Sequence, residues 1–111
     1  MDMLERLKET DRLVKQLNKE YPELTGALTE LYKKTGAEGA LPRKTKTIIL
    51  VALALASKCE WCIAYHVKHA LKAGVTKDEM IEACYLTTLI FGTSAWMNIN
   101  PVLKAIEAYE K

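Results

Sequence analysis

Apolar residues recur every three or four positions along most of the chain, which is the spacing of one face of an α-helix. Gly and Pro fall between these periodic segments, and no convincing alternating, β-branched stretch interrupts them. The pattern therefore predicts an all-α protein, a compact bundle of about six helices. The expected helices cover residues 2–18, 22–36, 43–56, 59–73, 76–91 and 100–109.

Residues at the ends of these segments support the assignment. Thr76 and Glu79 have the spacing of a capping box, which predicts that a helix begins directly after Thr76. Gly74 ends the segment before it, where a left-handed cap suits a residue without a Cβ. Asn100 and Pro101 read as the cap and first position of the last helix. Segment 43–56 is apolar nearly all round after Thr47, so we expect it to be the central helix.

Length and charge narrow the class of protein. A chain of 111 residues, half of them hydrophobic, is the size of one domain, and no repeat or linker divides residues 1–111. The net charge is only +2 and no long block has one sign, so nucleic acid is not an expected partner. The longest apolar run, residues 48–56, is far shorter than the ~20 residues that cross a bilayer. Charged residues also interrupt the first thirty, unlike a signal peptide, so we expect a soluble cytoplasmic protein.

Two of the three cysteines form the candidate chemistry. At ~100° per residue, Cys59, Cys62 and His66 fall on one face of the helix predicted over residues 59–73. Unpaired backbone amides in a first turn favour a thiolate, and a nearby imidazole can lower the thiol pKa or accept its proton. Two cysteines one turn apart can also close a disulfide, because their Cα separation falls within the usual ~4.4 to 6.8 Å. The pattern indicates a thiol oxidoreductase.

Other interpretations of these residues are weaker. Cys59 and Cys62 could be small apolar residues of a buried helix, but a histidine on the same face favours redox chemistry. A zinc site would need Cys59, Cys62, His66 and His69 together. On one helix the outer pair would stand ~15 Å apart along the axis, so no metal or other cofactor is expected. A thioredoxin fold would need strands. We expect His69 to be a bystander and Cys84 a small buried hydrophobe.

On these residues the chain resembles the carboxymuconolactone decarboxylase superfamily, and within it the alkyl hydroperoxidase D branch, which carries a CxxCxxxH motif on a helix. The likeness covers about residues 21–109 as a single domain. It rests on the apolar helix before the motif, on segment 76–82 and on five single residues, Cys59, Cys62, His66, Ala70 and Gly74. The resemblance implies a peroxidase that reduces a hydroperoxide through a thiol/disulfide pair. In that branch Cys62 would attack, Cys59 would resolve the sulfenic acid, and His66 would belong to a proton relay.

The chain departs from this pattern in the relay. The family has a glutamate twelve residues before the first cysteine, where this chain has Thr47, and often a histidine at the position of Trp61. Glu82 matches a position where relatives often have glutamate, and it is the expected replacement for the missing carboxylate. Two other roles are equally open for Glu82: helix capping, or a place on a solvent-facing helix surface. Two alternatives to a peroxidase are a lyase of the carboxymuconolactone decarboxylase type, which needs no cysteine pair, and a non-catalytic oligomeric binding module.

The chain is also expected to have protein partners. Short helices in so small a domain cannot hide every apolar face, and segment 86–97 with the final helix carries more large apolar groups than one facing helix could cover. We expect these residues to form a subunit interface, and the resemblance implies a homotrimer or homohexamer. A peroxidase cycle would also need a thiol reductant, either a protein or a small thiol.

Overall fold

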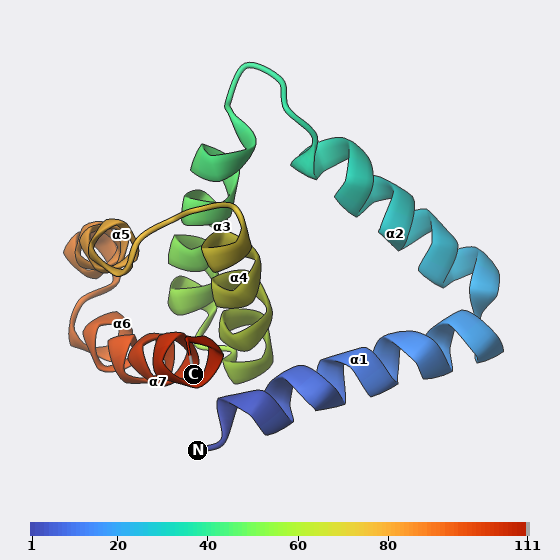
Figure 1. The fold of residues 1–111 in the computed structure, drawn as a ribbon, viewed down its shortest axis with the longest axis horizontal. Coiled ribbons are helices and arrows are strands. Elements are labelled where there is room, and N and C mark those ends of the chain that lie inside the picture. Colours follow the sequence, from blue (N-terminus) through green and yellow to red (C-terminus); the bar gives the residue numbers. More distant parts are fainter. Residues whose placement is uncertain (111) are drawn as a thin grey trace.

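The computed structural model describes residues 1–110, and all regular structure within that range is helical (Figure 1). The predicted all-α fold is confirmed. In chain order the helices are α1 (Met3–Glu20), α2 (Pro22–Gly36), α3 (Arg43–Ser57), α4 (Glu60–Lys72), α5 (Lys77–Phe91), α6 (Thr93–Met97) and α7 (Ile99–Tyr109).

Helix α4 lies at the centre of the packed part of the molecule, where it contacts α3, α7 and α1 (Figure 1). Helix α3, which its apolar composition predicted to be central, packs mainly against α4 and α5, so that prediction was wrong. The largest fully buried side chains are Leu55, Ile63, Met80, Ile106, Val51, Val67, Val102 and Cys84. One face of α3 stays uncovered, however, because Ile49 and Leu53 are exposed. Helix α4, which carries the CxxCxxxH motif, packs against the core through its buried residues Ile63, Ala64, Val67 and Ala70.

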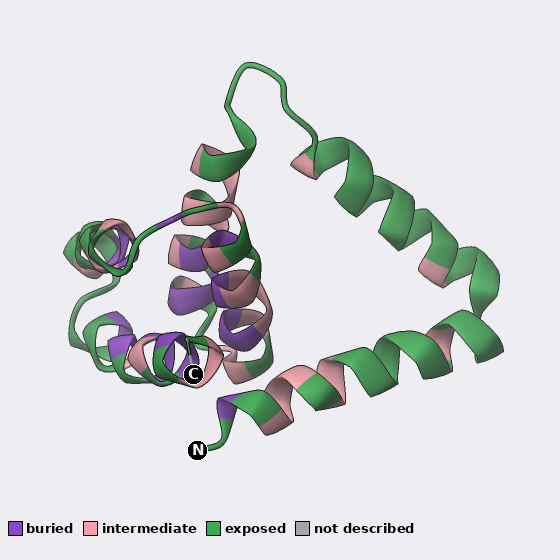
Figure 2. Cartoon of the chain, in the orientation of Figure 1, coloured by how far each residue is buried: buried purple, intermediate pink, exposed green. Residues whose placement is uncertain are grey.

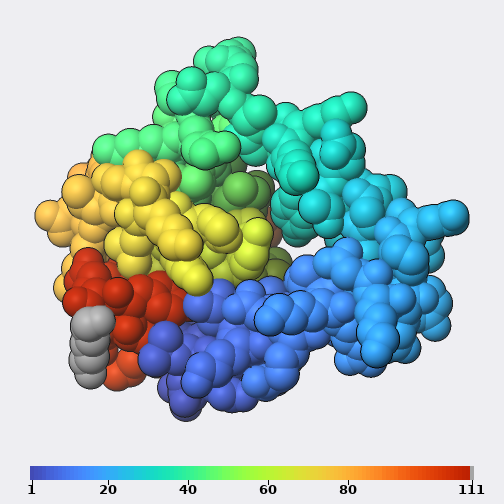
Figure 3. Space-filling model, turned by 45° about the vertical axis from the view of Figure 1, so that its right-hand side comes forward, coloured from blue at the N-terminus to red at the C-terminus, as the bar shows by residue number. Residues whose placement is uncertain are grey.

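Helices α1 and α2 form an arm on this core. Figure 1 shows α1 leaving the bundle and α2 returning towards the start of α3, and Figure 2 shows that α2 is exposed along almost its whole length. No residue of α2 is buried, and its contacts are mainly with α1. The Nζ atom of Lys46 on α3 donates to the carbonyls of Thr35 and Ala37, at 2.7 and 2.6 Å, and so ties down the far end of α2. An opening remains between α2 and the face of α3 and α4 (Figure 3).

Most helices begin and end close to the residues predicted from the sequence. The capping box is present: the Thr76 amide donates to Glu79 Oε1 at 2.9 Å, and the Glu79 amide donates to Thr76 Oγ1 at 3.1 Å. Gly74 has a φ of 87° directly after α4, as a left-handed cap requires.

The prediction for the C-terminal part was incomplete. Helix α6 was not expected, and α7 begins at Ile99 with Asn98 as its cap, so the assignment of that role to Asn100 was wrong. Pro101 is the third residue of α7, where its missing N–H costs nothing because the first turn has no intrahelical partner for it. A helix of 5 residues is also too short to show a helical period in the sequence.

Candidate redox site

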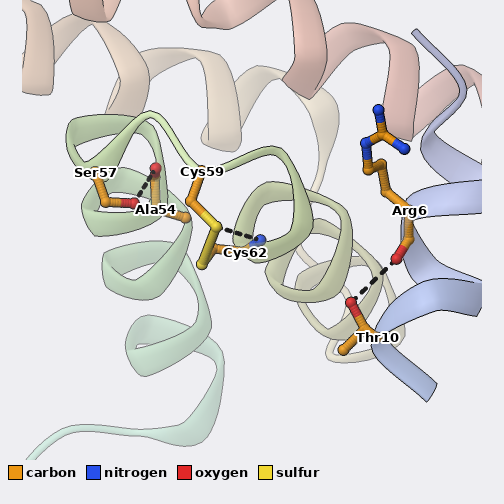
Figure 4. The surroundings of a disulfide bond; sticks show 6 residues. All are labelled: Arg6, Thr10, Ala54, Ser57, Cys59 and Cys62. Carbon is orange, nitrogen blue, oxygen red and sulfur yellow. Dashed lines mark hydrogen bonds between the residues drawn. A yellow bond between two sulfur atoms is a disulfide. The ribbon is translucent and has the colours of Figure 1, made fainter. Parts of the chain in front are cut away.

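The two cysteines lie at the start of α4. Cys59 is the N-cap, in an extended conformation, and Cys62 is the third residue of the helix. Their Cα atoms are 5.2 Å apart and their sulfur atoms are joined in a disulfide (Figure 4). The predicted proximity of the pair is confirmed. Because both residues belong to one helical turn, the pair can open and close without moving the rest of the fold.

The backbone of this turn also binds the first sulfur. The amide of Cys62 donates to Cys59 Sγ at 3.1 Å, so a sulfur takes the position that Ser or Asp oxygen usually has in a helix cap (Figure 4). When the disulfide is reduced, this amide and the positive end of the helix dipole favour a thiolate on Cys59. The chain enters the cap through Lys58, whose φ of 57° is left-handed. The geometry of this tight turn therefore fixes where the Cys59 sulfur lies.

An arginine from α1 reaches the segment between the cysteines, and no signal in the sequence points to it. The Nε atom of Arg6 is 3.4 Å from Oε1 of Glu60, and its guanidinium carbon is 5.3 Å from the centre of the Trp61 ring. A hydrogen bond to Glu9, at 2.6 Å, is the main reason that the pKa of Arg6 is raised. Arg6 thus remains a cation and connects α1 to the start of α4. Its contacts with Glu60 and Trp61 place a cation beside the CxxC turn.

His66 lies one turn after Cys62 on α4. It is half-buried and lines a hollow of about 540 Å³ between α2, α3 and α4. Burial lowers the pKa of His66, and the neighbouring His69 lowers it further. A lowered pKa keeps the imidazole neutral near pH 7, so His66 can accept a proton from a thiol. The spacing of four residues makes Cys62 its neighbour on the helix surface.

The two candidate relay positions lie in different places. Thr47 lines the same hollow as His66, and its hydroxyl donates to the carbonyl of Lys44 at 2.7 Å. Glu82 is exposed on α5, which packs mainly against α3, and it lines a separate, apolar hollow with Tyr85 and Leu86. The structure therefore brings Thr47 to the hollow of His66 and does not bring Glu82 there.

The third cysteine, Cys84, and the second histidine, His69, lie in different environments. Cys84 is fully buried, and burial raises the pKa of its thiol to about 11, so it stays an unreactive thiol as expected. His69 lines the same hollow as His66, with its ring centre 4.3 Å from that of Tyr65. Across residues 1–110, no group of three or more His, Cys, Asp or Glu side chains is placed to hold a metal ion. No helix in that range is long and apolar enough to cross a membrane.

Comparison with known proteins identifies the family of this chain. The sequence pattern of the carboxymuconolactone decarboxylase family matches residues 22–105, and the chain belongs to that family. It is 35% identical over 81 residues to uncharacterized protein 4 of the cox locus of Paracoccus denitrificans, which covers 73% of each chain. It is 27% identical over 107 residues to an uncharacterized protein of Cupriavidus necator, covering 96% of this chain and 95% of that protein.

A solved structure extends the likeness to the whole fold. The crystal structure of an apo carboxymuconolactone decarboxylase family protein from Legionella pneumophila superposes with a TM-score of 0.94 at 29% sequence identity. The match covers 98% of this chain and 97% of that one, so it includes the arm formed by α1 and α2. The resemblance inferred from the motif and its helical context is confirmed at the level of the family.

Proposed function

We propose that this protein is a thiol peroxidase that reduces hydroperoxides through the Cys59–Cys62 pair. The observation that carries the proposal is a disulfide at the start of α4 with a neutral imidazole one turn later on the same helix. A disulfide of this kind is the expected product of peroxide reduction by two thiols. The resemblance to the alkyl hydroperoxidase D branch supports the same chemistry.

The first step of the proposed reaction uses Cys62 and His66. His66 accepts the proton of the Cys62 thiol, and the thiolate attacks the terminal oxygen of the hydroperoxide. The O–O bond breaks, Cys62 becomes a sulfenic acid, and the leaving alkoxide takes the proton from His66 to give an alcohol. Cys62 suits this role because it lies on the same face of α4 as His66.

The second step uses Cys59. Its thiolate attacks the sulfur of the Cys62 sulfenic acid, the S–O bond breaks, and the oxygen leaves as water after taking a proton. The amide of Cys62 donates to Cys59 Sγ at 3.1 Å, and an N–H donor at this sulfur stabilises the thiolate that this step needs. Together the two thiols supply the two electrons that reduce the peroxide. A dithiol protein or small thiol then restores the pair, and we propose such a reductant as a partner.

We also propose that the protein is a homo-oligomer built on a trimer. Large apolar side chains of α5 lie in solvent in the single chain: Leu86 is 65% exposed, and Leu89 and Ile90 are each 79% exposed. Exposed apolar side chains of this size are typical of a subunit interface. Light scattering coupled to size exclusion tests this proposal. A mass near the 12.5 kDa of one chain would refute it.

Hydroperoxide turnover with defined variants tests the catalytic proposal. The wild type should consume an organic hydroperoxide in the presence of a dithiol, and one equivalent should convert two thiols into a Cys59–Cys62 disulfide detectable by mass spectrometry. Cys62→Ser should abolish consumption, and Cys59→Ser should allow one attack and leave a trapped sulfenic acid. The matched control is Cys84→Ala. Cys84 is the third cysteine and is buried, so its replacement should leave hydroperoxide consumption unchanged. No turnover by the reduced wild type refutes the proposal, and retained attack in Cys62→Ser reverses the roles.

A further inference from the structure

The hollow beside His66 has an unusual charge. Three helices line it: α2 through Thr29, Tyr32, Lys33 and Gly36, α3 through Arg43, Lys46, Thr47 and Leu50, and α4 with its C-cap Ala73 through Tyr65, His66, His69 and Lys72. These linings include four permanent cations, two imidazoles and two phenols, and no carboxylate from the described part of the chain. All permanent charges of the lining are positive, although the net charge of the whole chain is only +2. Positive charge is therefore concentrated at this hollow.

Three of the four cations are free to bind a ligand. Lys46 is committed, since its Nζ atom already donates to the carbonyls at the end of α2. Lys33, Arg43 and Lys72 are exposed and have no ion pair among the described residues. They come from three different helices, so a ligand that contacts all of them must lie between α2 and the core.

The pKa of His69 agrees with this excess of positive charge. Burial is the first cause that lowers the pKa of His69, and Lys72 and Lys68 lower it further. Asp11 of α1 acts in the opposite direction on His69 but does not outweigh the other causes. Burial raises the pKa of Tyr65, and the negative charge of Asp11 raises it further. The phenol of Tyr65 therefore stays protonated and can donate a hydrogen bond.

We propose that this hollow is a binding site for a small, multiply charged organic anion, such as an organic phosphate or a polycarboxylate. A volume of about 540 Å³ is in the range of pockets that enclose small ligands. Arg43 supplies a planar pair of donors for phosphate or carboxylate oxygens, and Lys33 and Lys72 supply point charges from opposite walls. The phenols of Tyr32 and Tyr65 add neutral donors and aromatic surface.

The bound anion would also connect helix α2 to the core. Helix α2 rests mainly on α1 and has no buried residue of its own. A ligand that bridges Lys33 on α2 to Arg43 and Lys72 would join the arm to the core and close the opening seen in Figure 3. The proposal does not depend on the peroxidase chemistry, because it concerns only binding between these three helices.

The two histidines provide a direct assay, since the chain has no others. Their ring proton resonances are titrated against pH by NMR, with and without inorganic pyrophosphate or citrate, at constant ionic strength. A bound anion favours the charged imidazole, so the pKa of His66 and of His69 should rise in a saturable way. Pyrophosphate and citrate separate the two ligand sources, because the tighter of the two identifies phosphate or carboxylate as the preferred group.

Single variants then test whether the named cations hold the anion. Lys33→Gln, Arg43→Gln and Lys72→Gln change exposed side chains, and each should weaken binding about tenfold, as loss of one charge-assisted hydrogen bond does. Lys104→Gln on α7, outside the hollow, is the matched control and should bind like the wild type. No saturable shift with either anion overturns the proposal. Equal binding by Arg43→Gln, Lys72→Gln and Lys104→Gln overturns it as well.

Discussion

The disulfide at the start of α4 should contribute a measurable part of the stability of the fold. Cys59 and Cys62 are separated by 3 positions, so the bond closes a loop of about four residues in the unfolded chain. The loop-closure entropy of so small a ring corresponds to about 2 kcal/mol at 25 °C. With a urea dependence of roughly 2 kcal/mol per molar for a domain of this size, reduction should lower the unfolding midpoint by about 1 M.

Variants at Cys59 separate the disulfide from the helix cap. Cys59→Ser removes the bond but leaves a hydroxyl that can accept the amide of residue 62, so it should unfold with the reduced wild type. Cys59→Ala also loses the cap and should be less stable by about another 1 kcal/mol. Cys84→Ala is the control, because it should keep the full difference between oxidised and reduced protein.

The assay is urea unfolding followed by circular dichroism, with and without a reductant, at several protein concentrations so that subunit association is taken into account. If oxidised and reduced wild type unfold at the same urea concentration, the disulfide does not stabilise the fold by constraining the unfolded chain. If Cys59→Ala and Cys59→Ser are equally stable, the sulfur of Cys59 does not act as a cap.

Three further predictions concern single side chains. Thr47→Glu should raise hydroperoxide turnover near neutral pH, because a carboxylate in the hollow of His66 would support proton transfer; an unchanged rate in a folded variant would show that another group serves. Tyr109→Phe should cost about 1 kcal/mol in urea unfolding, since its hydroxyl donates to the carbonyl of Ala64 at 2.9 Å, and wild-type stability would contradict a role for that bond. Lys58→Gly should raise stability by about 0.5 to 1 kcal/mol, because residue 58 has a φ of 57°, and thermal unfolding that shows no gain would refute the argument from backbone strain.

Local features of this protein could be predicted from the sequence. The capping box at Thr76 depends on residues within one turn, and the left-handed position of Gly74 follows from the residue type. The Cys59–Cys62 pair is local in the same sense, because a spacing of three residues on a helix fixes their separation. The short α6 gave no such signal, since 5 residues cannot show a helical period.

Contacts between distant segments were decided by the tertiary structure. The crossing of α3 and α4 places Thr47 in the hollow of His66, while Glu82 lies on α5 beside a different hollow. Arg6 reaches the motif from α1, and α2 carries Lys33 to the far wall of the hollow. The apolar period of a helix shows which face is buried but not which helix covers it or at what angle, so only the packed chain determines which charges and imidazoles meet.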